Sequence, residues 1–179
     1  MSARWPLGSW RAVALPTQRV GPVLPRRPAR LIGKKALGTD EGSVVEREIE
    51  ADVLAEIRGL RDRVRHVAGS LVATVDGRLV AHDTHGIEPD GMAALSAAVL
   101  GLSQRLIENV GPGQFAETVT RGTHGYVATY AAGPRAVLTV VTGEETNIGR
   151  LHLEARQVAH RLAALLDDLG ARVRTGNNP

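Results

Sequence analysis

Residues 67–81 read VAGSLVATVDGRLVA, and this stretch contains the clearest structural signal in the chain. An apolar run, 71–75, precedes the dipeptide Asp76-Gly77, and a shorter apolar run, 79–81, follows it. Asp-Gly between two apolar runs is the strongest short-range sign of a tight hairpin, because glycine accepts the positive φ that such turns require. The stretch therefore predicts a β-hairpin with Asp76-Gly77 at its turn.

An amphipathic helix is predicted on the N-terminal side of this hairpin and another at the C-terminal end of the domain. Apolar residues recur at spacings of three and four over 49–67, and Gly69 is the predicted stop. The same spacing recurs over 148–169, after the candidate caps Thr146 and Asn147 and before Gly170, where we expect the last helix to end. Each helix is expected to bury one apolar stripe.

The helix predicted after the candidate N-cap Asp90 has two apolar surfaces. One is a stripe of larger side chains that we expect to face the core: Met92, Leu95, Val99, Leu102, Leu106 and Val110. The other is a face of small residues, on which another backbone can approach closely: Ala93, Ala94, Ala97, Ala98 and Gly101. The small face favours self-association or a protein partner, and packing against the protein's own sheet is the alternative.

Three further strands are predicted at 117–120, 126–130 and 136–141, joined by turns that contain glycine. The order is therefore helix, two strands, helix, three strands, helix. Five short strands can bury an apolar layer only where helices cover them. The pattern predicts an α+β fold that contains a hairpin and an antiparallel meander.

Composition divides the 179 residues into three parts. Residues 1–43 are predicted to be a disordered, basic, proline-rich extension, because the first 40 residues hold eight of the 22 basic residues and five of the nine prolines. Residues 44–170 are the predicted domain, with a flexible tail at 171–179. For the extension, binding to anionic lipid or nucleic acid and a start codon assigned too early are alternatives to a plain solvated segment.

The charge of the domain argues against nucleic acid as its partner. The net charge of +3 comes from the extension, since 14 basic and 18 acidic residues remain after residue 40. No run approaches the roughly 18 apolar residues that cross a bilayer. We therefore expect a cytoplasmic protein without a transmembrane segment.

The residue types exclude most catalytic chemistry. The chain has no cysteine. Both of its lysines, Lys34 and Lys35, lie in the extension, so the domain has no lysine that could bind nucleotide phosphates or form a Schiff base with a substrate. There is no G-x-S-x-G nucleophile motif. The histidines and carboxylate of 82–85 are a weak metal signal, and His152 and His160 are predicted to be solvated. We expect no catalytic residue, no metal and no cofactor.

Several segments together resemble the Roadblock (dynein light-chain type) family, specifically its short bacterial members. They are 67–81, the helix start MAAL at 92–95, the strand VLTVV at 137–141 and the helix start TNIGRL at 146–151. The resemblance covers about residues 45–170. It implies a profilin-like αββαβββα fold, a five-stranded antiparallel sheet with the central helix on one face and the terminal helices on the other.

The resemblance also implies a function. Family members typically form homodimers through the central helix and an edge strand, and bacterial members are scaffolds or regulators of Ras-like small GTPases in signalling. We therefore expect a non-enzymatic dimeric GTPase regulator. The expected dimer or partner interface comprises Ala94, Ala97, Ala98, Gly101, Arg105, Thr118 and Thr120. A domain that senses a small molecule, or a general protein-interaction domain, is the alternative.

Overall fold

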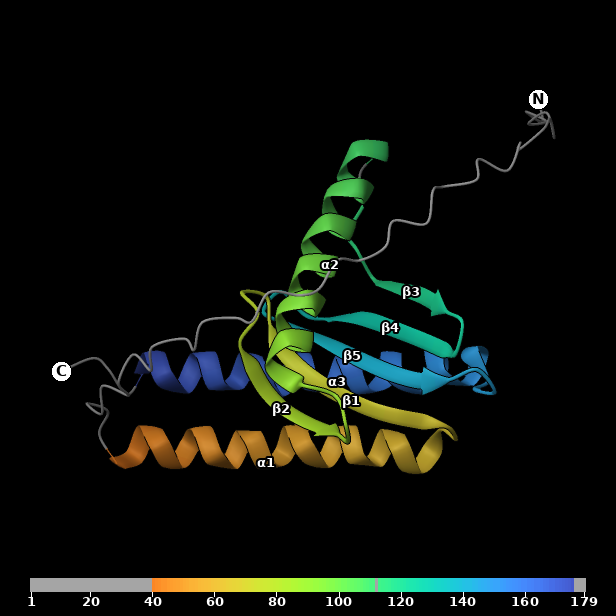
Figure 1. Ribbon diagram of the computed structural model, residues 1–179. Helices are drawn as coiled ribbons and strands as arrows, with labels where there is room; N and C mark the ends of the chain where they lie inside the picture. The colour runs from red at the N-terminus through yellow and green to blue at the C-terminus, as the bar shows by residue number, and fades with distance from the viewer. Residues whose placement is uncertain (1–39, 112, 176–179) are drawn as a thin grey trace, which may run out of the picture. The chain divides into compact units, whose positions relative to one another are not determined.

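The computed structural model describes residues 40–111 and 113–175, with side chains for 47–111 and 113–168. Within these residues, three helices and five strands follow in the predicted order (Figure 1). The helices are α1 (Asp40–Arg63), α2 (Pro89–Val110) and α3 (Ile148–Thr175). The strands are β1 (Val67–Thr74), β2 (Leu79–Thr84), β3 (Glu117–Gly122), β4 (Gly125–Ala132) and β5 (Ala136–Gly143).

The predicted terminal segments lie largely outside the described residues. The extension predicted at 1–43 is outside them as far as residue 39, and α1 begins at Asp40. The tail predicted at 171–179 is outside them from residue 176. The helix end predicted at Gly170 is wrong, because α3 continues through this glycine to Thr175. One interior glycine costs a helix only about 1 kcal/mol relative to alanine.

The five strands form one antiparallel sheet in the order β2-β1-β5-β4-β3. β1 and β2 form the predicted hairpin, but the first strand ends at Thr74 rather than Val75, so residues 75–78 connect the two strands. Gly77 in this connection has a φ of 87°. β3, β4 and β5 form the predicted meander. The pairing of β1 with β5, in which Leu71 lies opposite Thr139, joins the two parts. The edges of the sheet are therefore β2 and β3 (Figure 1).

The helices cover the two faces of the sheet unequally. α1 and α3 lie side by side on one face, and α2 lies on the other (Figure 1). The larger core lies beneath α1 and α3, and its fully buried members include Ile57, Leu60, Tyr130, Leu138, Leu151 and Leu162. The core beneath α2 is small and consists of Leu71, Ala73, Ala93 and Val137. Most of the apolar burial that stabilises the fold therefore lies on the face of the sheet that α1 and α3 cover.

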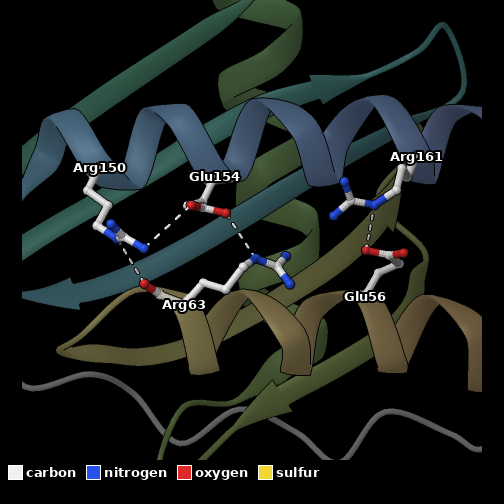
Figure 2. Close-up of polar contacts among 5 residues, drawn as sticks. All are labelled: Glu56, Arg63, Arg150, Glu154 and Arg161. Carbon is white, nitrogen blue, oxygen red and sulfur yellow. Dashed lines mark hydrogen bonds and ion pairs between the residues drawn. The ribbon is translucent and has the colours of Figure 1, made fainter.

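Ion pairs link α1 and α3 along their outer surface (Figure 2). Glu154 accepts from Arg63 Nε at 2.9 Å and lies 3.7 Å from Arg150 Nη2, and Arg150 Nε donates to the Arg63 carbonyl at 3.0 Å. One further pair joins Arg161 Nε to Glu56 at 2.9 Å. These pairs show that the helices are antiparallel. Among the described residues, no helix is long and apolar enough to span a membrane.

The boundary between α1 and β1 differs from the predicted one. α1 ends at Arg63, and Val67, predicted as the last apolar position of the helix, opens β1 opposite Thr142 of β5. Between them His66 has a φ of 65°, in the left-handed region that ends a helix. The spacing from Val64 to Val67 fits a helix, but the strand pairing determines the structure.

Candidate protein–protein interface

The outward face of α2 carries a stripe of large apolar side chains. Leu95, Leu102, Leu106 and Val110 are 63%, 64%, 67% and 84% exposed. Their spacings of seven, four and four residues place them along one side of the helix. In Figure 1 the second half of α2 extends past the sheet. Exposed apolar patches on soluble domains are typical of interaction sites.

The prediction that the stripe faces the core is wrong for these four residues, whereas Met92, also predicted to face the core, is half-buried and packs against the small core beneath α2. The buried residues of α2 are Ala93 and Ser96, which turn toward the sheet. The Ser96 hydroxyl accepts a hydrogen bond from Thr139 of β5 at 2.7 Å and donates one to the Met92 carbonyl at 2.7 Å. Small side chains let the helix approach the sheet closely. Turning the leucines inward would break this buried hydroxyl pair and leave Thr139 unsatisfied.

Two of the predicted interface residues, Ala98 and Arg105, are exposed within this stripe. Ala98 follows Leu95 by three residues and precedes Leu102 by four, so the three share one side of α2. Gly101 is also exposed, and a Cβ atom placed there would have no atom within 4 Å beyond the adjoining backbone of its own helix. The outward face of α2 is therefore open to a second molecule.

The predicted residues Ala94 and Ala97 lie beside the protein's own β1–β2 turn. A Cβ atom placed on Gly77 would lie 3.2 Å from the Ala94 Cα atom and 3.7 Å from the Ala97 Cβ atom. Ala94 is still exposed, whereas Ala97 is half-buried. The small residues at these positions thus serve the contact between α2 and the hairpin.

Thr118 and Thr120, the remaining predicted residues, lie on the edge strand β3. Thr118 is opposite Thr129, which is opposite Thr139, the partner of Ser96. Because alternate residues of a strand share a face, Thr118 and Thr120 are on the α2 side of the sheet. The structure therefore places the predicted α2 and β3 residues on the same side of the sheet.

The two sheet edges are unequally protected. α1 and α2 both lie against β2. Arg61 of α1 donates to the Asp83 carbonyl of β2 at 3.2 Å and pairs with its carboxylate at 3.1 Å. β3 is paired with β4, and all six of its residues are exposed or half-buried. An unprotected edge strand is a template for another strand, so β3 is the edge available for pairing.

A polar cluster connects β3 with α3. Glu117 accepts hydrogen bonds from Arg156 Nε at 2.8 Å and from Arg156 Nη2. His152 Nδ1 lies 3.3 Å from Glu117 Oε1 and 3.1 Å from the Tyr130 hydroxyl. The hydrogen bonds from Arg156, followed by the charge of His152, lower the pKa of Glu117, and burial raises the pKa of Tyr130.

The histidines of α3 differ in their surroundings. His160 is exposed, as predicted, whereas the prediction that His152 is solvated is wrong. The His152 side chain is 23% exposed and its ring packs edge-on against Tyr130, with centroids 5.8 Å apart. Among the described residues, no three His, Asp or Glu side chains converge as metal ligands.

An open hollow of about 910 Å³ lies between α2 and α3 at one end of the sheet. Leu100 and Gln104 of α2 line one side, and Arg156 and His160 of α3 line another. Phe115 and Tyr130, two of the three aromatic residues after residue 40, line it as well. Its volume lies within the range of small-molecule sites.

The family model of the Roadblock/LC7 domain matches residues 53–142, just over half of the chain, from the middle of α1 to near the end of β5. This chain belongs to the Roadblock/LC7 family. The match covers α2 and β3, the two elements that carry the predicted interface of this Roadblock domain, and leaves α3 outside.

Solved structures share the fold of this Roadblock domain. The Roadblock/LC7 domain from Streptomyces avermitilis superposes with a TM-score of 0.58 at 24% identity, over 63% of this chain and 96% of that one. MglB from Myxococcus xanthus gives 0.58 at 17% identity, over 68% and 96%. The gliding protein MglB from Thermus thermophilus gives 0.53 at 22%, over 74% and 94%.

A curated relative of this Roadblock domain is an uncharacterized protein of Methanocaldococcus jannaschii. It is 25% identical over 105 residues, which cover 58% of this chain and 91% of the relative.

Sequence reasoning about this Roadblock domain missed the outward orientation of the leucines of α2 and the polar cluster around Glu117, which comprises Glu117, Arg156, His152 and Tyr130. A signal existed for the leucines, because a helix with two apolar faces can bury only one of them against its own sheet.

Proposed function

We propose that this Roadblock domain is a non-catalytic, dimeric regulator or scaffold that binds a Ras-like small GTPase and modulates its GTP hydrolysis. The two observations that carry the proposal are the exposed leucine stripe of α2 and the unprotected edge strand β3. Roadblock domains are regulatory rather than catalytic, and the described residues include no lysine that could contact a nucleotide phosphate.

In the proposed dimer a second copy of the chain covers the α2 stripe. A twofold interface uses the same patch on both copies, so Leu95, Ala98 and Leu102 of one copy would face the same residues of the other. The β3 edges of two copies could then pair antiparallel and extend the sheet. Such a dimer would bury the leucine stripes of both copies, and removing this apolar area from water would stabilise the association.

The proposed action on the GTPase requires no chemistry from this chain. The switch segments of a GTPase exchange between conformations, and a partner that binds one of them more tightly shifts that population. A scaffold would bind both conformations equally and leave the rate of hydrolysis unchanged. A change in the rate of GTP hydrolysis on binding therefore separates a regulator from a scaffold.

GTP turnover by candidate small GTPases, especially any encoded beside this gene, provides the test of this function. We expect one of them to bind the full chain and to hydrolyse GTP at a changed rate when the chain is present. Phosphate release, measured with and without the chain, gives the rate, and titration of each nucleotide state gives the affinities. A GTPase that binds without a rate change identifies a scaffold, and the absence of binding to all of them contradicts the proposal.

The hollow between α2 and α3 supports a second candidate, a site for a small molecule. Its apolar walls, two aromatic rings and the polar groups of Gln104, Arg156 and His160 have the composition of ligand pockets. A ligand at 100 times its Kd would stabilise the domain by about 2.7 kcal/mol. A thermal-shift screen with nucleotides and common metabolites tests this candidate, and saturable stabilisation by one compound would favour it.

A further inference from the structure

The edge strand β3 has few contacts that fix its position. Its residues are half-buried or exposed, and among them Val119 is the one that packs against the large apolar core. Hydrogen bonds to β4 hold one side of the strand, while the other side is open. β3 therefore needs a further contact with the rest of the domain if its backbone is to keep a single conformation at the open edge.

Glu117, the first residue of β3, provides such an anchor. Its carboxylate binds the guanidinium of Arg156 through two hydrogen bonds and lies 3.3 Å from the imidazole of His152. Arg156 and His152 are four residues apart, so they project from consecutive turns of one face of α3. Tyr130 lies opposite Glu117 in the β3–β4 pairing and contacts the same imidazole.

We infer that Glu117 is a positioning residue for the partner edge: its contact with Arg156 and His152 of α3 holds β3 in the geometry that pairs with a second copy. The inference rests on the proposed dimer. The Glu117 side chain points to the α3 side of the sheet, whereas Thr118 points to the α2 side. Glu117 therefore acts on the dimer through the strand and not by touching the α2 surface of the partner.

Preorganisation explains why this contact affects association. A strand that must become ordered on binding uses part of the binding free energy for that ordering. Arg156 is on the surface, its side chain 63% exposed, but the Glu117 side chain is only 18% exposed and both of its oxygens are engaged. A two-pronged arginine–carboxylate contact fixes geometry better than a single point charge. The cluster thus holds the start of β3 in place before the partner arrives.

Glu117→Gln is the test, with Glu154→Gln as the matched control. Glu154 is likewise a carboxylate with two basic partners, in its case Arg63 and Arg150, and its side chain is 15% exposed. These contacts join α3 to α1 and do not involve β3. For Glu117→Gln we expect backbone amides of 117–122 to exchange hydrogen roughly tenfold faster, and the Kd of the dimer to rise roughly tenfold. Glu154→Gln should change neither quantity by more than about twofold.

A second variant, Arg156→Gln, keeps the inference testable if Glu117→Gln does not fold by circular dichroism. Arg156→Gln should give the same two effects, and the double variant should add little to either single one, because both remove the same contact. The inference is wrong if Glu117→Gln and Glu154→Gln give equal exchange rates and equal Kd values. If the unsubstituted chain is monomeric, the proposed dimer is wrong, and the exchange rates of β3 still decide whether Glu117 anchors the strand.

Discussion

Leu162→Ala should lower the free energy of unfolding by about 2–5 kcal/mol, whereas Leu102→Ala should change it by less than about 0.5 kcal/mol. The Leu162 side chain of α3 is fully buried in the core, so its truncation leaves a cavity. Leu102 of α2 is 64% exposed and loses little contact within one copy. Urea denaturation in an Ala98→Glu background, expected to be monomeric, removes dimer dissociation from the comparison.

Equal losses for Leu102→Ala and Leu162→Ala would contradict the described orientation of α2. That result would mean that the leucine stripe is packed in the core of a single copy, as the sequence pattern predicts. A control in the small core, Leu71→Ala, should also be costly, because Leu71 is fully buried between α2 and the sheet. Comparison of the three variants thus shows which face of α2 packs against the sheet within a single copy.

Local signals account for the parts of the fold that the sequence predicts correctly. The turn Asp76-Gly77 determines the hairpin, Gly122 and Gly125 flank the turn between β3 and β4, and Gly133 lies in the turn between β4 and β5. The cap predicted at Asn147 is confirmed, since its side chain accepts from the Arg150 amide at 2.9 Å. Each of these features depends on residues a few positions apart, and such features can be interpreted from one sequence.

The start of α2 shows how a cap is misassigned. The sequence predicts Asp90 as the N-cap, but Glu88 occupies that position and accepts from the amides of Asp90 and Gly91 at 3.0 and 2.6 Å. Pro89 then stands at the first helical turn, where its missing N–H costs nothing. Glutamate is an uncommon cap, so residue preference alone favoured the aspartate.

The orientation of α2 and the Glu117 cluster could not be predicted in the same way. Periodicity shows that Leu95 and Leu102 share a face, but an apolar face can be buried against the protein's own sheet or against a partner. The choice depends on Thr139 of β5, which is 43 residues from its hydrogen-bond partner Ser96. The Glu117–Arg156 contact spans 39 residues and likewise has no local signal.

Ala98→Glu should dissociate the proposed dimer. Ala98 lies between Leu95 and Leu102 on the outward face of α2, so the substitution would place a charge on each copy at the centre of the interface. A buried charge without a partner costs about 3–5 kcal/mol, which raises Kd by roughly a hundredfold or more. The side chain is exposed in a single copy, so the fold should be retained, and circular dichroism checks this.

Sedimentation equilibrium on the full chain, Ala98→Glu and the control Ala164→Glu tests directly whether the outward face of α2 is the dimer surface. Ala164 is an exposed alanine of α3, so its substitution introduces the same charge away from α2. We predict a mass of 38.0 kDa, twice the 19.0 kDa of the chain, for the unsubstituted protein and for Ala164→Glu, and 19.0 kDa for Ala98→Glu. A monomeric unsubstituted protein, or an Ala98→Glu variant that remains at 38.0 kDa, would contradict the assignment of this face.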